Sequence, residues 1–271
     1  MIILAGTPIG NLGDASRRLV EALGEATTIA AEDTRTTQKL LRALEIENRP
    51  RLIPLHDHNE KQKAAEIVEL ARESDVLVLS DAGMPTVSDP GYGLVAAAAE
   101  AGVEVTAIPG PSAVLTALAI SGLPTDRFTF EGFVPRKPGD RRRVLEAVAR
   151  DPRTLVFFEA PSRVVQTLRD MAAAFGSDRR AAVARELTKL YEQVKRGSLA
   201  ELAEWADGGV RGELVIVVGG ATAREMPLDE ALARVAALVS DGTRLKDATR
   251  AVAQETGHGA RDLYDAHLAA R

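Results

Sequence analysis

Short apolar stretches alternate with helical patterns along the first 120 of the 271 residues. Continuous apolar runs predict strands at 1–5, 27–31, 51–55, 75–79 and 103–108. Apolar positions at helical spacing predict helices at 16–23, from Asp33 or Thr34 onward, and at 59–72, 91–101 and 112–120. Strands without polar interruptions are typical of a sheet that is covered on both faces. This order therefore predicts a mainly parallel sheet with right-handed crossovers.

The pattern changes after residue 120, where strands become more closely spaced. Strands are predicted at 128–130, 155–158, 181–184, 191–194 and 213–218, which favours a mixed sheet with hairpins. The end of the chain is helical, with predicted helices at 228–239, 246–255 and 260–269. We therefore expect an α/β protein with two α/β domains, residues 1–120 and 121–221, and a small helical domain, residues 222–271.

Composition narrows the class of protein. The chain has no cysteine, so disulfides, cysteine-bound zinc, iron–sulfur clusters and thiol nucleophiles are excluded. The pair His56 and His58 is interpreted as a solvated loop, so no metal is expected. There is no apolar run near 18 residues and no basic, apolar leader at the start, which predicts a cytoplasmic protein without a membrane span. The net charge of −5 argues against a basic field over the whole molecule, although a local basic patch remains possible.

Three unusual loops follow strands of the first sheet, at residues 6–11, 80–91 and 109–113. Each combines glycine and proline with small polar residues, which lets backbone N–H groups approach a ligand closely. Any one of them could be a plain strand–helix turn, but ligands of open α/β sheets bind beyond the carboxyl ends of the strands. Together they predict a shared crevice. The glycine patterns of dinucleotide-binding enzymes and of P-loop proteins are missing. Glu32 and Asp33 do follow the second strand, where a dinucleotide-binding enzyme has its ribose-binding carboxylate. Pro8, however, stands where that pattern needs a flexible backbone close to the ligand, so a nicotinamide enzyme is the weaker interpretation.

Eight motifs in order resemble the tetrapyrrole methylase superfamily, more narrowly its RNA-modifying branch. They are TPIGNLGD, AAEDTRTTQKLL, HDHNE, SDAGMPTVSDPG, PGPSAVLTALAISGLP, FEGFVPRK, FFEAPSRV and ARELTKLYEQVKRG. The resemblance covers about residues 3–220, and the helical tail is similar to an extra domain of the same branch. Met84 and Ser162 stand where the branch usually has threonine and histidine.

The resemblance implies a homodimer that binds S-adenosylmethionine between two α/β domains. It also implies methylation of the 2′-oxygen of a cytidine in the decoding region of 16S rRNA, within the 30S subunit. By their position in the motifs, seven residues are implied as cofactor contacts: Pro8, Ile9, Gly10, Asp81, Met84, Ser112 and Ala113. Phe158 and Leu187, from the second domain, are the candidates for contact with the adenine. The first turn of the helix after Ser112 would offer N–H groups to a carboxylate.

A weakly acidic ribose hydroxyl would benefit from a base within hydrogen-bond reach. The candidate catalytic residues are Lys189, Glu186 and Glu131, and the alternative is a salt-bridged strand end. A lysine that is desolvated near a cationic sulfonium could have a lowered pKa and act as the base.

A basic run beside Phe133 predicts contact with RNA phosphates, and its members are Arg136, Lys137, Arg141, Arg142 and Arg143. The alternative is a solvated helix face. Arg35 is a further candidate for the RNA substrate. The cations of the tail, Arg244, Lys246, Arg250 and Arg261, fit either RNA binding or an appendage that packs in a dimer.

Two other functions stay open at this point. One is a methyltransferase of the same superfamily that acts on a corrin or porphyrin precursor, which would need neither the basic run nor the tail. The other is a non-catalytic RNA-binding module for ribosome assembly, which would not bind S-adenosylmethionine.

Overall fold

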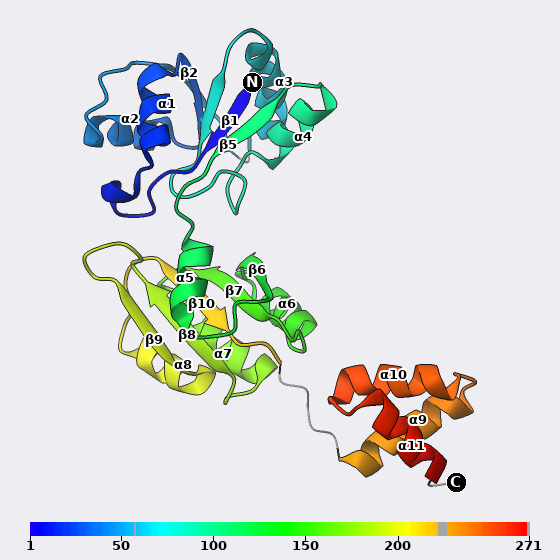
Figure 1. Cartoon of the computed structure of the whole chain (residues 1–271). Coiled ribbons are helices and arrows are strands. Elements are labelled where there is room, and N and C mark those ends of the chain that lie inside the picture. The colour runs from blue at the N-terminus through cyan, green and yellow to red at the C-terminus, as the bar shows by residue number, and fades with distance from the viewer. Residues whose placement is uncertain (57, 222–226, 270–271) are drawn as a thin grey trace. The chain divides into compact units, whose positions relative to one another are not determined.

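The computed structural model describes residues 1–56, 58–221 and 227–269 (Figure 1). These residues form two compact units: residues 1–148 with 154–219, and residues 149–153 with 220–271. The first unit contains both sheets and the second contains the C-terminal helices. The predicted division of the first unit at residue 120 stays a prediction.

The first sheet is entirely parallel, with the strand order β3-β2-β4-β1-β5. Its strands are β1 (Ile2–Ala5), β2 (Thr28–Ala31), β3 (Arg51–Pro54), β4 (Val76–Leu79) and β5 (Val105–Ile108). Because β4, β1 and β5 are neighbours and parallel, the loops that leave their carboxyl ends emerge side by side. This order confirms the predicted architecture and places the three glycine- and proline-containing loops at one edge.

Helices cover both faces of this sheet, as its apolar strands predicted. One face packs against α1 (Arg17–Glu25) and α2 (Thr34–Ala43), and the other against α3 (Glu60–Glu73) and α4 (Tyr92–Glu100). Side chains fix two of the helix starts: Ser16 Oγ accepts from the N–H of Leu19 at 3.1 Å, and Asp33 Oδ1 accepts from the N–H of Arg35 at 2.8 Å. A short 3₁₀ turn, η1 (Leu12–Asp14), lies between β1 and α1.

The second sheet is mixed, with the order β6-β7-β10-β8-β9. Its strands are β6 (Phe128–Phe133), β7 (Thr154–Glu159), β8 (Arg180–Arg185), β9 (Gln193–Ser198) and β10 (Leu214–Val218). Only β6 and β7 pair in parallel, and the other pairs are antiparallel. The mixed sheet predicted from the close strand spacing is confirmed.

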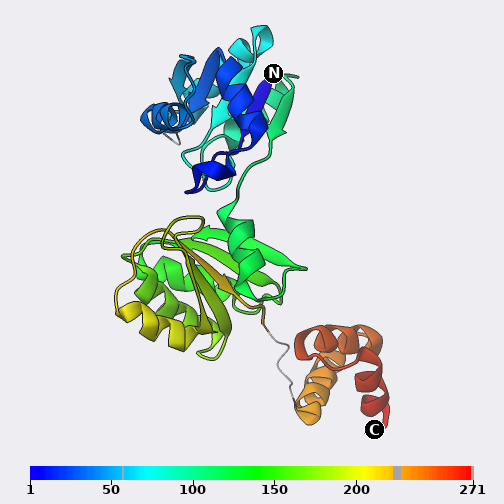
Figure 2. The same ribbon diagram turned by 60° about the vertical axis from the view of Figure 1, so that its left-hand side comes forward.

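Helix α5 (Ala113–Ser121) packs on the face of the second sheet that carries Val156, Val215 and Val217. Helices α6 (Pro138–Val148), α7 (Val164–Phe175) and α8 (Leu199–Asp207) lie on the other side (Figure 2). Helices α7 and α8 were not predicted. For α8 the signal was present, because Ser198 and Glu201 form a capping box in which each side chain accepts from the other residue's N–H.

The second unit contains α9 (Leu228–Ser240), α10 (Leu245–Thr256) and α11 (Ala260–Ala269). Its apolar core consists of Ala231, Val235, Ala248, Val252 and Leu263. The cations singled out in the tail, Arg244, Lys246, Arg250 and Arg261, are exposed. Among the helices of the described residues, none is long and apolar enough to cross a membrane.

Candidate active site

Backbone contacts join the three loops at the carboxyl edge of the first sheet. Thr7 and Gly83 form an isolated β-bridge: the N–H of Thr7 donates to the carbonyl of Gly83 at 2.9 Å, and the reverse bond is 3.1 Å. Gly6 and Gly110 are still closer, because a Cβ added to Gly6 would lie 2.6 Å from the Cα of Gly110. Only glycine permits this approach. The structure therefore holds the bases of all three loops together.

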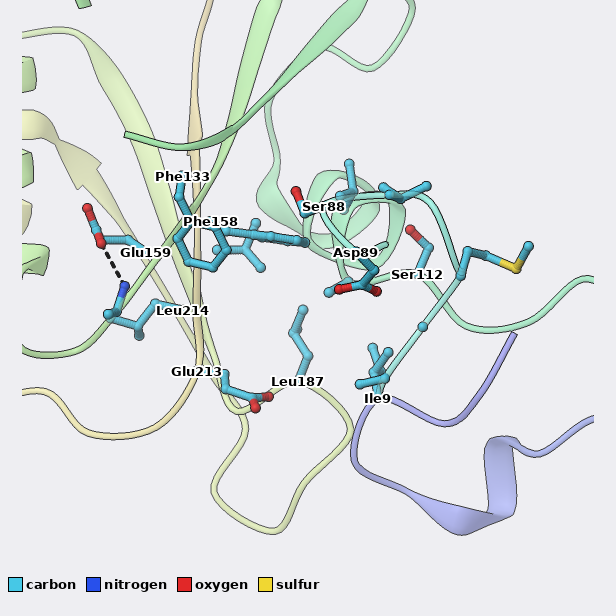
Figure 3. Close-up of a pocket in the computed structure, with 18 of the residues that line it drawn as sticks. Ile9, Ser88, Asp89, Ser112, Phe133, Phe158, Glu159, Leu187, Glu213 and Leu214 are labelled. Atoms are coloured by element: carbon cyan, nitrogen blue, oxygen red, sulfur yellow. Dashed lines mark hydrogen bonds between the residues drawn. The ribbon is translucent and has the colours of Figure 1, made fainter. Parts of the chain in front are cut away.

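A cavity of about 370 Å³ opens between these loops and the second sheet, and we call it the main cavity (Figure 3). It contains six of the nine residues predicted to bind the cofactor: Ile9, Met84, Ser112, Ala113, Phe158 and Leu187. Its walls are mostly apolar, with a few polar groups, and its volume falls in the range of about 300–1,000 Å³ that is usual for ligand pockets.

The polar wall of the main cavity is acidic. Three carboxylates line it, those of Asp89, Glu159 and Glu213, while among the described residues no lysine or arginine does. Glu159 is buried and paired. Its Oε1 lies 2.5 Å from Arg163 Nη2 and accepts from the N–H of Ala160 at 2.7 Å, and its Oε2 accepts from Thr167 Oγ1 at 2.6 Å. The wall therefore offers carboxylate oxygens to a ligand, two of these groups being already paired with a cation, Glu159 with Arg163 and Glu213 with Lys189.

The amino-terminal end of α5 also faces the main cavity, through Ser112 and Ala113. Ser112 Oγ caps the helix by accepting from the N–H of Leu115 at 3.4 Å. N–H groups in the first turn have no acceptor within their own helix, and the helix dipole favours an anion there. This end can hold a carboxylate beside the otherwise acidic wall.

Lys189 forms an ion-paired cluster at the edge of the main cavity. Its Nζ lies 3.0 Å from Glu186 Oε1 and 2.9 Å from Glu213 Oε2. Burial by itself lowers the pKa of Lys189, but the hydrogen bonds to Glu213 and Glu186 outweigh burial, so the pKa is raised above 10.5. The pKa of Lys189 is therefore raised where the sequence predicted a lowered one, and its catalytic role stays a prediction.

The loop that carries this cluster has an unusual backbone. Glu186 and Thr188 have positive φ values of 50° and 65°. Glu186 Oε1 accepts from the N–H of Glu213 at 2.9 Å; this bond and then Lys189 lower the pKa of Glu186. Gly212 must lack a side chain, because an added Cβ would lie 2.4 Å from Glu186. Two further non-glycine residues with positive φ, Thr86 and Ser88, belong to the loop on the opposite wall.

Pro8 and Gly10 do not line the main cavity in the described structure, although Ile9 between them does. Gly10 instead supports the lysine, because an added Cβ would lie 2.5 Å from Lys189 Cγ and 2.9 Å from Thr188 Oγ1. This loop therefore contacts the Lys189 loop directly, and its glycine is required by packing.

Asp81 lies outside the lining of the main cavity, beside the start of α2. Partial burial and the neighbouring charge of Asp33 raise the pKa of Asp81, and this outweighs hydrogen bonds from the N–H of Asp33 and from Thr36. The N–H of Asp81 donates to Glu32 Oε2 at 3.2 Å. The cofactor role predicted for Asp81 stays a prediction.

Glu131 also lies outside the lining of the main cavity, and its Oε1 accepts from Thr129 Oγ1 at 2.7 Å. It sits at a β-bulge in β6, where the register shifts between Phe130 and Gly132. This position does not bring Glu131 together with Glu186 and Lys189, so its catalytic role stays a prediction.

The basic run divides into buried and exposed members. Arg141 is buried, and its Nε lies 2.5 Å from Asp170 Oδ2, which corrects its prediction as a phosphate contact: a buried, paired guanidinium has no access to RNA. Four members are exposed, Arg136, Lys137, Arg142 and Arg143. Among these exposed members, Arg143 forms an ion pair with Asp140 at 2.9 Å. Arg35, the further candidate for RNA contact outside the run, is also exposed and forms an ion pair with Asp33 at 2.7 Å.

Sequence reasoning missed several residues that shape the site. Glu213 and Asp89 line the main cavity, and Glu213 could have been noticed as the polar residue just before the apolar stretch 214–218. Glu60, within the motif HDHNE, accepts through Oε1 from the N–H groups of Gly91 at 3.0 Å and Leu94 at 3.2 Å. It thereby fixes the end of the loop 80–91.

Within residues 1–56, 58–221 and 227–269, no group of three or more histidine or acidic side chains could hold a metal ion. Asp57, between the two histidines of the HDH segment, lies outside the described residues.

Comparison with known proteins identifies the family to which the chain belongs. The model of the family described as tetrapyrrole (corrin/porphyrin) methylases matches residues 1–203, and the chain belongs to this family. Over its full length the chain is 49% identical to ribosomal RNA small subunit methyltransferase I of Mycobacterium tuberculosis (strain CDC 1551 / Oshkosh), covering 95% of that protein. It is 41% identical to the protein of the same name from Escherichia coli O157:H7, with 97% of this chain and 93% of that protein covered.

Solved structures share the fold. The methyltransferase CobJ has a TM-score of 0.61 and 23% identity, and the match covers 83% of this chain and 96% of that one. Uroporphyrin-III C-methyltransferase from Thermus thermophilus, complexed with S-adenosylhomocysteine, has a TM-score of 0.55 and 22% identity, covering 80% of this chain and 96% of that one. At these identities the likeness concerns the fold alone.

Proposed function

We propose that this protein methylates the 2′-oxygen of a cytidine ribose in the decoding region of 16S rRNA, on the 30S subunit in the cytoplasm. S-adenosylmethionine is the methyl donor, and the activity is that of a small-subunit rRNA methyltransferase. The observation that carries the proposal is the full-length similarity, at 41–49% identity, to proteins named ribosomal RNA small subunit methyltransferase I.

The main cavity fits this donor chemically. The donor combines an aromatic base, a sulfonium and an amino acid with both an ammonium and a carboxylate. Phe158, Leu187 and Ile9 offer an apolar wall for the base. The acidic wall attracts the two cationic groups, and the first turn of α5 offers N–H groups to the carboxylate.

The donor supplies a methyl group that is already activated on sulfur, so positioning is the main task of the protein. The cluster of Glu186, Lys189 and Glu213 has two carboxylates for one ammonium. After the N–H of Glu213 and Lys189, the charge of Arg185 also acts on Glu186 and lowers its pKa. Glu213 lines the cavity and offers its carboxylate oxygens to the cationic part of the donor. Lys189 itself does not line the cavity, and its ammonium holds the carboxylate of Glu213, 2.9 Å away, at the cavity edge.

An accepting hydroxyl loses its proton in such a reaction, and the structure narrows the candidates. Glu186 already accepts two hydrogen bonds at Oε1, and its lowered pKa makes it a weak base. Glu213 lines the cavity, and its side chain is 79% exposed, so water can reach it. We assign Lys189 and Glu186 to holding Glu213 and the charge of the site, and Glu213 to receiving the proton directly or through water.

Two alternatives make different predictions. A methyltransferase for a corrin or porphyrin precursor would label a uroporphyrinogen-type substrate, and a non-catalytic assembly module would not bind S-adenosylmethionine. The homodimer stays a prediction as well, and light scattering on the purified protein measures it.

The test is transfer of radiolabelled methyl to purified 30S subunits that lack modifications, with a uroporphyrinogen-type substrate in parallel. We expect label in 16S rRNA only. Nuclease digestion followed by mass spectrometry then locates the methyl on a cytidine 2′-oxygen. Label on a base carbon or nitrogen would contradict the finer assignment, and label in the tetrapyrrole alone would contradict the rRNA substrate. Glu213→Gln should slow the transfer at saturating donor.

A further inference from the structure

A groove continues outward from the main cavity along the end of β6. Its lining includes Arg136, Ser162 and Arg163, and it shares Phe133 and Ala160 with the main cavity. Phe133 therefore lies at the junction of the two, as the side chain between the donor-binding walls and the surface.

The backbone of β6 places Phe133 at this junction. The β-bulge shifts the register between Phe130 and Gly132, and Gly132 has a positive φ of 66°. The ring of Phe133 packs beside that of Phe158, with centroids 5.5 Å apart and planes at 59° (Figure 3). Phe158 is half-buried, whereas Phe133 remains 54% exposed. A large apolar ring is thus supported on one side and open to solvent on the other.

Two guanidinium groups hold the segment that follows Phe133. Arg141 Nη1 donates to the carbonyl of Arg136 at 3.2 Å, and Arg163 Nη1 donates to the carbonyl of Val134 at 3.2 Å. Both arginines are engaged by carboxylates as well, Arg141 by Asp170 and Arg163 by Glu159. The side chain of Arg136 is left exposed on a backbone that is fixed from within.

The charges of the two spaces differ. The main cavity is lined by carboxylates and, within the described residues, by no lysine or arginine, so it disfavours a phosphate. The groove is lined by the exposed Arg136, and by Arg163, which is already paired with Glu159. A nucleotide that reaches the donor from outside would therefore keep its phosphate in the groove and bring only its ribose toward the main cavity.

We propose that Phe133 is the platform on which the base of the target nucleotide stacks, with its phosphate beside Arg136 and its ribose at the mouth of the main cavity. This inference rests on the proposed function, because it concerns the RNA substrate. Base stacking on an exposed aromatic ring is a common means of holding an unstacked nucleotide, and enzymes that modify single nucleotides take them out of the helical stack.

The test compares three variants at this position with a matched control. Phe133→Leu keeps an apolar side chain but removes the aromatic face, Phe133→Trp keeps an aromatic face, and Phe133→Ala removes the side chain. Phe128→Leu is the control, because Phe128 is in the same strand, is 36% exposed, and lines neither space. For each protein, calorimetry gives the affinity for S-adenosylmethionine, and transfer of labelled methyl to 30S subunits gives kcat/KM.

We expect kcat/KM for 30S subunits to fall about tenfold or more in Phe133→Leu and Phe133→Ala, and to be largely retained in Phe133→Trp. The affinity for S-adenosylmethionine should fall much less than kcat/KM, because Phe133 is only one of many residues that line the main cavity, whereas the stacking contact with the RNA base is lost completely. Phe128→Leu should match the wild type.

Three results would overturn the inference. Equal kcat/KM for Phe133→Leu and the wild type would mean that no base stacks there. A parallel loss of S-adenosylmethionine affinity would assign Phe133 to the donor. An equal loss in Phe128→Leu would indicate damage to β6 and no special role for Phe133. If the wild type itself labels no 30S subunit, the proposed function fails, and this inference fails with it.

Discussion

The guanidinium of Arg141 meets the carboxylate of Asp170 at 2.5 Å inside the protein, whereas its neighbours Arg142 and Arg143 are exposed. One basic run therefore serves two purposes. The buried member fixes the backbone of the run through the carbonyl of Arg136, and the exposed members present charge to the surroundings.

Arg141→Ala should lower the free energy of unfolding by about 3 kcal/mol, because it leaves Asp170 without its charged partner in a partly buried place. Arg143→Ala should change it by less than about 1 kcal/mol, since the side chain is 79% exposed. Urea titration of both variants measures the difference. Equal stability of the two would contradict the structural role of Arg141.

Neutralising Arg136, Lys137, Arg142 and Arg143 should weaken binding to 30S subunits and flatten its salt dependence. Each lost phosphate contact should reduce the slope of log affinity against log salt by roughly 0.7–0.9. Filter binding over a salt series compares the variant with the wild type. Superimposable curves would make the exposed run a solvated helix face. The affinity for S-adenosylmethionine is the control and should not change.

Gly10→Ala should displace Lys189, because the new Cβ would lie 2.5 Å from Lys189 Cγ. We expect methyl transfer to fall about tenfold or more, as misplacement of positioning groups is costly. Gly24→Ala is the matched control: Gly24 lies within α1 with nothing within 4 Å of an added Cβ, so this change should stabilise the protein by about 0.5–1 kcal/mol. An active Gly10→Ala enzyme would show that the Lys189 cluster tolerates movement.

The pKa of Glu186 is lowered from 4.5, first by the N–H of Glu213 and then by Lys189. A lowered carboxyl pKa stabilises the folded state fully above the unfolded value, and the stabilisation is lost as the pH falls through the folded value. Glu186→Gln should therefore be less stable than the wild type at neutral pH, and the difference should shrink below pH 4.5. Thermal unfolding across this range measures it. A difference that grows toward acid pH would contradict the charge assignment.

The stability that Lys189 contributes depends on pH in the opposite direction. Its raised pKa means that the ammonium contributes stability below 10.5 and loses it only as the pH rises through the higher folded value. The rate of methyl transfer should consequently show no rise across neutral pH that depends on Lys189. Lys189→Met supplies the comparison, since a neutral-pH inflection present in the wild type and absent from this variant would restore Lys189 as the base.

Much of the fold could be predicted because local signals agree with it. Ser16, Asp33 and Ser112 cap the helices that they were expected to open, and continuous apolar runs became the strands of the parallel sheet. Asn59, the first residue of the helix predicted at 59–72, gives no side-chain cap to α3, because its Oδ1 accepts from the N–H of His56 instead. Such competition between acceptors is decided by loop geometry that a sequence does not show.

The candidate site was predictable at its glycine and proline loops and less so at its charges. Arg141 lies four residues before the fully buried Leu145, and this helical spacing already places it on the inner face of α6. No such periodicity marks Asp81, whose position beside Asp33 and Thr36 depends on how the loop after β4 lies against the start of α2. The pairing of Lys189 with Glu213 joins residues 24 positions apart and depends on the second sheet having formed.

The backbone approach of Gly6 to Gly110 has a consequence for protein engineering. A Cβ added to Gly110 would lie 2.6 Å from the carbonyl oxygen of Gly6, and one added to Gly6 would meet both Gly110 and Met84 Sδ. Neither position has a smaller partner residue that could compensate, so a library randomised at these two sites would return mostly glycine. Variation aimed at a new acceptor substrate is therefore better placed on the outer groove, where Phe133, Arg136 and Ser162 have space for other side chains.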